Sequence, residues 1–192
     1  MSVLAAVETN SRMILLTGRP GSGKTTVVSR VVLLLRADGL SVGGVYSKER
    51  RSHGTRVGFE MVDLATDGHE TLASTTATGP RMGRYRVNLK GLGEFAAPAI
   101  ARAMSESDVV VCDEAGPMEL ISPEFRRAVE GLMVTRKPCL VVVHGEMADP
   151  LLVRLKKSTE AQLLEVTDET RNSLPEAVYA KIKAWMRSNR GP

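Results

Sequence analysis

The sequence is poor in aromatic residues and has no long apolar run. Aromatic residues make up 4% of the 192 residues, so few rings are available on which the bases of nucleic acids could stack. No stretch approaches the roughly 18 consecutive apolar residues of a membrane-spanning helix. Residues 1–10 lack the basic start and the apolar centre of a signal peptide. We therefore expect a cytoplasmic protein with neither a membrane partner nor a nucleic-acid partner.

Cysteine and histidine are also scarce, with two and three residues. Their spacing supports neither a disulfide framework nor a metal site made of these residue types. Cys112 and Cys139 each lie in a run of valines or leucines, which is typical of thiols buried in strands. His53 and His69 lie in polar, turn-like sequence, and we expect both on the surface.

The chain has the balance of one folded domain, with 43% hydrophobic and 25% charged residues. Strand-like apolar runs alternate with helical patterns, which predicts an α/β fold whose mostly parallel sheet is covered by helices on both faces. We expect a single domain over residues 1–192, a flexible tail over residues 1–11, and a monomer. The net charge of +4 suits a polyanionic ligand.

A glycine-rich phosphate-binding loop, or P-loop, is the strongest functional signal. Residues 18–25 read Gly-Arg-Pro-Gly-Ser-Gly-Lys-Thr, between an apolar strand ending at Thr17 and a helix predicted over residues 24–38. The backbone N–H groups of such a loop face one anionic centre, here the phosphates of a nucleoside triphosphate. Lys24 should reach the β- and γ-phosphates, and the Thr25 hydroxyl should bind Mg²⁺. The predicted nucleotide-binding residues are Gly18, Arg19, Pro20, Gly21, Ser22, Gly23, Lys24, Thr25 and Thr26.

An acidic pair, Asp113 and Glu114, follows the apolar run at residues 109–112. Ligands bind at the carboxyl edge of parallel strands, so Asp113 is placed to bind Mg²⁺ opposite Thr25. Glu114 lies one residue further and could orient and deprotonate a water molecule at the γ-phosphate. This arrangement favours hydrolysis, with Glu114 and Lys24 as the catalytic residues. The alternative is that Glu114 only caps a turn or pairs with an arginine.

His144 ends another apolar strand, predicted over residues 139–143 beside the strand of Asp113. Its side chain could hydrogen-bond the γ-phosphate or the attacking water. A histidine that merely satisfies its hydrogen bonds at a strand end explains the sequence equally well.

Several arginines could stabilise charge on the transferred phosphoryl group. Arg81 and Arg84 are the favoured candidates for a phosphate or lid contact, because Gly79 and Gly83 allow the backbone around them to move. Arg51 and Arg56 lie in or beside a predicted antiparallel insertion. The other expected elements are strands over residues 42–46, 56–64, 70–74 and 162–166, and helices over 92–105, from Ser122 to near Arg136, over 150–157 and over 175–187.

With these residues in place, the chain resembles the small nucleoside-triphosphatase family first described from thermophiles. Beside the P-loop, the resemblance rests on residues 42–46, 56–64, 79–85 and 113–120, followed by Pro138 and His144. The run Asp-Glu-Ala-Gly-Pro-Met-Glu-Leu at 113–120 is the most specific part. The resemblance implies a three-layer P-loop NTPase fold and Mg²⁺-dependent hydrolysis of several nucleoside triphosphates, with loose base selectivity.

The chain departs from the family pattern at three places. Ala115 stands where the family usually has Ile, a change that affects packing rather than chemistry. Gly145 stands where an arginine is common, so any phosphate contact of that arginine is lost or made by another side chain. Thr170-Arg171 replaces a common Asn-Arg pair, which changes any contact of that pair with the base.

Two other functions fit the same P-loop. One is a nucleotide or nucleoside kinase whose acceptor pocket lies under the loop at residues 81–84. The other is a nucleotide-switched RNA-binding module, which the basic charge supports and the few aromatic residues disfavour.

Overall fold

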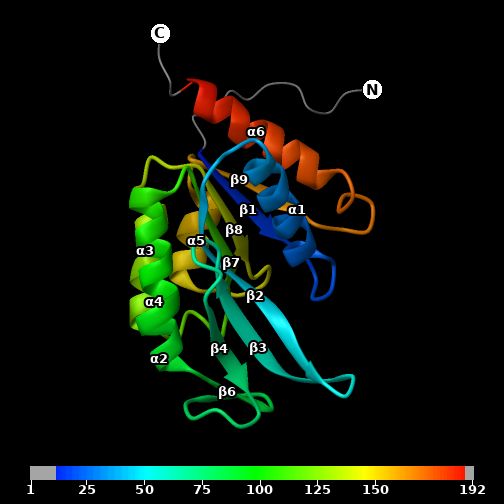
Figure 1. Ribbon diagram of the computed structural model, residues 1–192, viewed down its shortest axis with the longest axis vertical. Helices are drawn as coiled ribbons and strands as arrows, with labels where there is room; N and C mark the ends of the chain where they lie inside the picture. Colours follow the sequence, from blue (N-terminus) through cyan, green and yellow to red (C-terminus); the bar gives the residue numbers. More distant parts are fainter. Residues whose placement is uncertain (1–11, 189–192) are drawn as a thin grey trace.

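The computed structural model describes residues 12–188, in which helices cover both faces of one continuous sheet (Figure 1). The tail expected over residues 1–11 lies outside the described residues. The nine strands follow the spatial order β5-β6-β4-β3-β2-β7-β8-β1-β9. Their bounds are β1 Met13–Thr17, β2 Val42–Ser52, β3 Thr55–Asp63, β4 His69–Ser74, β5 Arg81–Met82, β6 Tyr85–Val87, β7 Val109–Ala115, β8 Cys139–Val143 and β9 Ala161–Glu165.

The sheet has a parallel part and an antiparallel part. Strands β2, β7, β8, β1 and β9 run parallel to one another, as the alternation of strands and helices predicted. Strands β3, β4, β6 and β5 continue the same sheet in antiparallel pairing and extend away from the helices (Figure 1). The parallel part therefore provides the strand ends at which ligands bind, and the antiparallel part extends beyond them.

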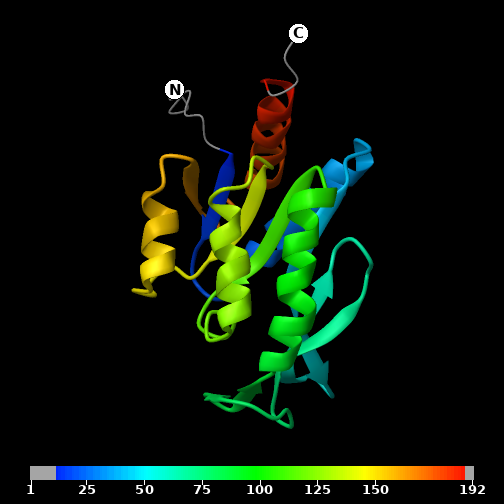
Figure 2. The ribbon, with the colours of Figure 1, turned by 90° about the vertical axis from the view of Figure 1, so that its left-hand side faces the viewer.

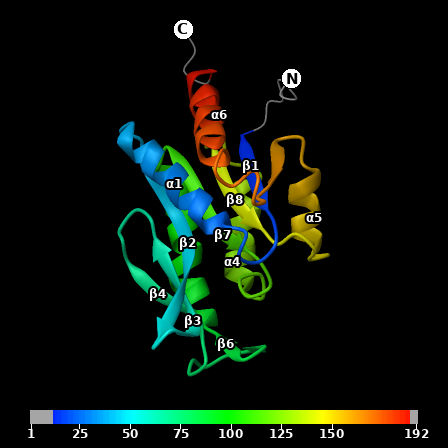
Figure 3. The ribbon, with the colours of Figure 1, turned by 90° about the vertical axis from the view of Figure 1, so that its right-hand side faces the viewer.

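Five main helices form the outer layers. α3 (Ala97–Glu106), α4 (Pro123–Leu132) and α5 (Pro150–Lys157) cover one face of the sheet (Figure 2), and α1 (Lys24–Ala37) and α6 (Leu174–Ser188) cover the other (Figure 3). A short α2 (Leu89–Gly91) and a π-helical turn, η1 (Leu92–Ala96), lead into α3. Within residues 12–188, no helix is long and apolar enough to cross a membrane.

The alternation of side chains along the buried strands creates two cores. In β1, Met13 and Leu15 pack with the core under α3, α4 and α5, while Ile14 and Leu16 pack with the core under α1 and α6. Successive side chains of a strand point to opposite faces, so a continuously apolar strand serves both layers. Cys112 and Cys139 are buried free thiols on the first of these faces, as predicted.

Three predicted element bounds were wrong. The strand predicted over residues 42–46 continues to Ser52, because its second half pairs with β3 in antiparallel register. The helix from Ser122 ends at Leu132 rather than near Arg136, and the N–H groups of Val134 and Thr135 close a turn on the Gly131 carbonyl oxygen. A glycine in the last turn weakens a helix. The helical region predicted from residue 92 begins at Leu89, where the Asn88 side chain accepts the Gly91 N–H.

Candidate active site

A cleft of about 1000 Å³ crosses the carboxyl ends of the parallel strands. Its lining at one end consists of the P-loop and residues 144–146. The Asp113–Glu114 pair and residues 117–119 line its middle. Its far end lies on the antiparallel part of the sheet and is lined by Ser47, Lys48, Glu49, Arg56, Phe59, Leu72 and Met82. The P-loop and the acidic pair predicted from the sequence thus lie in one cleft.

The P-loop connects β1 to α1 as predicted. Gly23 immediately precedes α1 with φ 99°, a backbone conformation that favours glycine. A Cβ atom at Gly18 would lie 2.5 Å from the Val166 carbonyl oxygen, so the start of the loop has no room for a side chain. The ammonium of Lys24 donates to the carbonyl oxygens of Gly18 and Arg19, at 3.0 and 3.1 Å. The cation is therefore held inside the curve of the loop.

Asp113 is a buried carboxyl group, 2% exposed, close to the P-loop. Burial raises the pKa of Asp113 to about 7, against the opposing effect of the Thr25 hydroxyl beside it. Within residues 12–188, the buried side-chain atoms without a hydrogen-bond partner are Asp113 Oδ2, Thr17 Oγ1 and Ser22 Oγ. Thr17 and Ser22 belong to β1 and the P-loop, and Asp113, in β7, lines the same cleft. Buried polar atoms of this kind indicate a ligand that supplies the missing partners.

The donors near the loop fit Mg²⁺. Thr25 offers a hydroxyl oxygen and Asp113 a carboxylate oxygen, and Mg²⁺ prefers oxygen ligands. The described part of the chain contains no cluster of three or more His, Cys, Asp or Glu side chains that could hold a metal ion alone. A magnesium ion here would therefore share its coordination between these two residues, substrate phosphates and water, as is usual for this metal.

Glu114 and Glu119 place two carboxyl groups in the middle of the cleft. Glu114 is half-buried, and Glu119 is 6% exposed. The Gly116 N–H donates to Glu119 Oε2 at 3.1 Å. Burial, assisted by the nearby charge of Glu114, raises the pKa of Glu119 to about 8. The sequence alone assigned no role to Glu119, although an acidic residue between the apolar Met118 and Leu120 indicates a carboxyl group that is partly buried.

His144 lies in the cleft at the end of β8, the strand next to β7, as predicted. Its Nδ1 accepts the Met147 N–H at 3.2 Å, which leaves Nε2 to carry the proton of the neutral ring. The Lys156 ammonium donates to the carbonyl oxygens of His144 and Gly145, at 2.8 and 2.7 Å. Lys156 was missed from the sequence because it reaches this loop from α5.

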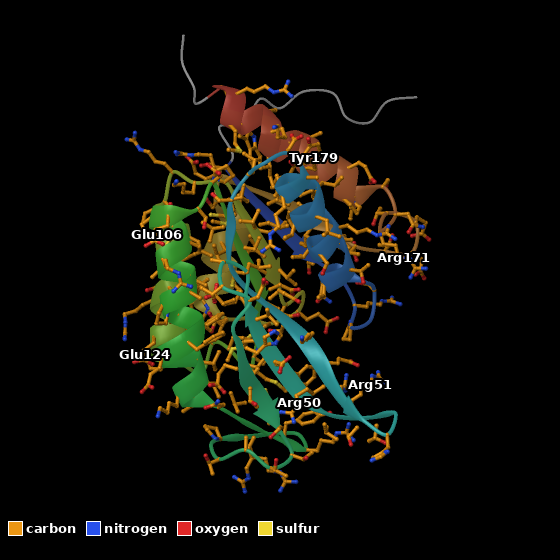
Figure 4. All side chains as sticks on the ribbon, in the orientation of Figure 1. Arg50, Arg51, Glu106, Glu124, Arg171 and Tyr179 are labelled. Carbon is orange, nitrogen blue, oxygen red and sulfur yellow. The ribbon has the colours of Figure 1, made fainter. Side chains whose placement is uncertain are left out.

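The structure separates the candidate arginines. Arg56 lines the cleft, with its guanidinium 5.2 Å from the centre of the Phe59 ring and hydrogen bonds to Tyr85 Oη and Glu49 Oε1. Arg81 and Arg84 lie outside the cleft lining at the β5–β6 hairpin, where they donate to the carbonyl oxygens of Gly83 and Arg56. Their predicted phosphate or lid contacts would require this hairpin to move, and they stay predictions. Arg50 and Arg51 lie far along β2 (Figure 4).

The opposite end of the P-loop faces the turn between β9 and α6. A Cβ atom at Gly23 would lie 3.8 Å from Arg171 Cδ, and Figure 4 shows Arg171 at this turn. Thr170, which stands where the family commonly has Asn, donates its hydroxyl to the Glu165 carbonyl oxygen at 2.8 Å. Thr170 therefore stabilises the turn itself, and Arg171 lies beside the loop that would hold phosphate.

Comparison with known proteins agrees with this geometry. The sequence model of a family described as NTPase matches residues 13–179. Proteins named nucleoside-triphosphatase THEP1 from Methanothermobacter thermautotrophicus and Methanopyrus kandleri are 44% and 41% identical to the chain. These alignments cover 88% and 90% of this chain and 92% and 96% of the relatives.

Solved structures show the same fold. The crystal structure of THEP1 from the hyperthermophile Aquifex aeolicus matches with a TM-score of 0.78 and 28% identity, over 89% of this chain and 99% of that one. The solution structure of a human cancer-related nucleoside triphosphatase matches with a TM-score of 0.78 and 29% identity, over 91% and 98%. The family match and the identities above 40% over most of the chain lead to one conclusion. The chain belongs to the nucleoside-triphosphatase (NTPase) family.

Proposed function

We propose that this protein hydrolyses nucleoside triphosphates to the diphosphate and inorganic phosphate, with Mg²⁺ and with little selectivity for the base. The observation that carries the proposal is the buried, unpartnered Oδ2 of Asp113 beside the Thr25 hydroxyl at a complete P-loop. A buried carboxylate oxygen without a partner is costly, and its retention at a phosphate-binding loop is explained by a bound cation and nucleotide.

The residues divide the work in the proposed reaction. The N–H groups of residues 18–25 and the Lys24 ammonium bind and orient the phosphates. Glu114 accepts a proton from the attacking water, whose oxygen forms a bond to the γ-phosphorus. The bond from this phosphorus to the bridging oxygen breaks, and the diphosphate leaves with the electron pair. Thr25 and Asp113 would hold Mg²⁺, which neutralises charge on the phosphate oxygens when bound.

Broad base selectivity is the finer part of the proposal. Its support is that the related proteins carry the name nucleoside-triphosphatase, which specifies no base. The deeply buried polar side chains of the cleft, Asp113 and Glu119, lie at its middle beside Glu114, where the phosphates rather than the base would bind. Strong discrimination between bases usually needs buried hydrogen-bonding groups that meet the base itself.

The test is phosphate release from ATP, GTP, CTP and UTP, with no added acceptor, in Mg²⁺ and in excess chelator. We expect release from all four in Mg²⁺ and almost none in chelator. Glu114→Gln should lower kcat by about 10²- to 10⁴-fold while nucleotide binding is unchanged. Release that begins only when a nucleoside or small alcohol is added would identify a kinase instead. Release from one triphosphate alone would contradict the broad selectivity.

The monomeric state and the cytoplasmic location expected from the sequence belong to the same proposal. Size-exclusion chromatography with light scattering at the assay concentration tests the first, and cell fractionation tests the second. A dimer in solution would show that the monomer prediction is wrong.

A further inference from the structure

The turn between β7 and α4 brings the carboxyl groups of Glu114 and Glu119 close to the same side of Gly116. A Cβ atom at Gly116 would lie 2.7 Å from Glu114 Oε1 and 3.1 Å from Glu119 Oε2. Contacts below 3.0 Å do not occur for real Cβ atoms without movement of the neighbours, so residue 116 must lack a side chain for Glu114 to stay where it is. Gly116 thus makes room for both carboxyl groups.

Glu119 is fixed more firmly than Glu114. It is 6% exposed, and its Oε2 accepts the N–H of Gly116. The turn that carries it is closed by two backbone bonds, from Leu120 N to Gly116 O at 3.0 Å and from Ser122 N to Glu119 O at 3.1 Å. The half-buried Glu114 therefore shares the space beside Gly116 with a buried, hydrogen-bonded carboxyl group.

We propose that Glu119 is a positioning residue, which acts in its protonated form to hold the Glu114 carboxylate in place for water activation. The inference rests on the function proposed above and adds a residue to it. A neutral Glu119 fills the space beside Glu114 without placing a second negative charge there. An ionised Glu119 would repel both Glu114 and the anionic triphosphate.

The surroundings of Glu119 favour the protonated form near neutral pH. Burial raises the pKa of Glu119 to about 8, and the charges of Glu114 and Asp113 add to the effect. The Cys112 thiol, on β7 with Asp113 and Glu114, is neutral because burial raises its pKa well above the usual range. Most of the basic groups of the cleft and of α4 make bonds to other partners: Lys24 to Gly18 O, Lys48 to Glu60, Arg56 to Glu49, Arg126 to Asp149, Arg127 to Glu124, and His144 with the Met147 N–H. Arg19, in the P-loop, also lines the cleft.

Glu119→Gln tests the proposal, because glutamine keeps an acceptor for the Gly116 N–H and is neutral at every pH. We expect its kcat at pH 7 to lie within about threefold of the native value. The native enzyme should lose activity as pH rises through about 8, whereas the variant should keep its activity. Coincident pH profiles of the two enzymes would overturn the proposal.

Two further variants address the geometry. Glu119→Ala and Gly116→Ala should each lower kcat by about tenfold or more while KM for the triphosphate changes by less than threefold. Glu124→Gln, an exposed acid at the start of α4, is the matched control and should leave kcat unchanged. If Glu119→Ala alters KM and thermal stability without changing kcat, Glu119 is a structural cap and the proposal fails.

A measurement without turnover separates this inference from the function on which it rests. Carboxyl ¹³C NMR should show a glutamate that titrates near pH 8 in the native protein and is missing in Glu119→Gln. If the native protein releases no phosphate from any triphosphate, the proposed function fails whatever the spectrum shows. If it releases phosphate and no glutamate titrates near pH 8, only the role of Glu119 is overturned.

Discussion

The side-chain ammonium of Lys24 lies 3.0 Å from the carbonyl oxygen of Gly18, so the P-loop is closed across its own lysine. A second bond, to the Arg19 carbonyl oxygen at 3.1 Å, holds the ammonium at the same place. The cation is thus fixed in the curve of the loop, where the backbone N–H groups and the start of α1 also favour an anion.

Lys24→Met is therefore expected to weaken triphosphate binding by tenfold or more, because it removes the ammonium held in the curve of the loop. It should also lower stability by about 1–2 kcal/mol through the two lost hydrogen bonds. Isothermal titration with a non-hydrolysable triphosphate measures the first effect and chemical unfolding the second. Lys157→Met, at an exposed position of α5, is the control. Equal affinities of the two variants would contradict the role of Lys24.

The Asp113 carboxyl group should determine the dependence on Mg²⁺. Asp113→Asn keeps the size of the side chain but removes the charge, so we expect phosphate release in Mg²⁺ to fall by about 10²-fold or more. Binding of the triphosphate in chelator should stay within about threefold of the native affinity, since the phosphates are held by the loop. An Asp113→Asn variant with native activity and native Mg²⁺ dependence would exclude Asp113 as a metal ligand.

The strongest local patterns of the sequence correctly predicted the parallel part of the sheet. The P-loop, the apolar run before Asp113 and the strand before His144 correctly placed one edge of the sheet, because these patterns are local and have a physical reason at each residue. The extended length of β2 was missed. Residues 47–52 are polar, and what makes them a strand is their pairing with β3, a contact that no local pattern contains.

The site residues, too, divide into those that local patterns predict and those that only contacts between elements place. The sequence indicated Asp113 and Glu114 because they follow a recognisable apolar run, whereas Glu119 and Lys156 reach the site through hydrogen bonds of the folded chain, which no local pattern contains. The preference for Arg81 and Arg84 over Arg56 followed from backbone flexibility. The register of β3 against β2 and the ring of Phe59 direct Arg56 into the cleft instead.

Stability should depend on pH through Glu119. Burial, with the charge of Glu114, raises its pKa from 4.5 to about 8. Below pH 4.5 the group is protonated in both folded and unfolded protein, and folding has no ionisation cost. Between pH 4.5 and about 8 the glutamate is ionised in the unfolded chain but protonated in the folded protein, so the free energy of unfolding falls across this range and levels off above it.

Glu119→Gln removes this dependence. Relative to the native protein, the variant should gain roughly 2–4 kcal/mol between pH 5 and pH 8.5, because over this range the native protein keeps Glu119 protonated when folded and releases the proton when unfolded. Urea unfolding at several pH values measures the difference, and the other titrating groups cancel in the comparison. A constant difference between the two proteins across this range would contradict the raised pKa.

Lys156 should support the loop that carries His144. Lys156→Met keeps the aliphatic stem but removes the two bonds to the His144 and Gly145 carbonyl oxygens. The loop should then become more mobile, and we expect kcat to fall about three- to tenfold with little change in overall stability. Hydrogen exchange at residues 144–147 measures the mobility, with Lys157→Met as the neighbouring control. Unchanged exchange in Lys156→Met would show that the loop is held by other contacts.

Arg56 offers the last comparison, because it is the cleft-lining member of the arginines in the antiparallel part of the sheet. If its guanidinium stabilises charge on the transferred phosphoryl group, Arg56→Ala should lower kcat about tenfold or more, and Arg56→Lys should restore only part of it, since lysine lacks the planar fork. Arg50→Ala, on the exposed part of β2, is the control and should have native kcat. Arg56 also holds Glu49 and Tyr85, so unfolding curves must accompany the kinetics. A loss of stability in Arg56→Ala with native kcat would limit Arg56 to organising the far end of the cleft.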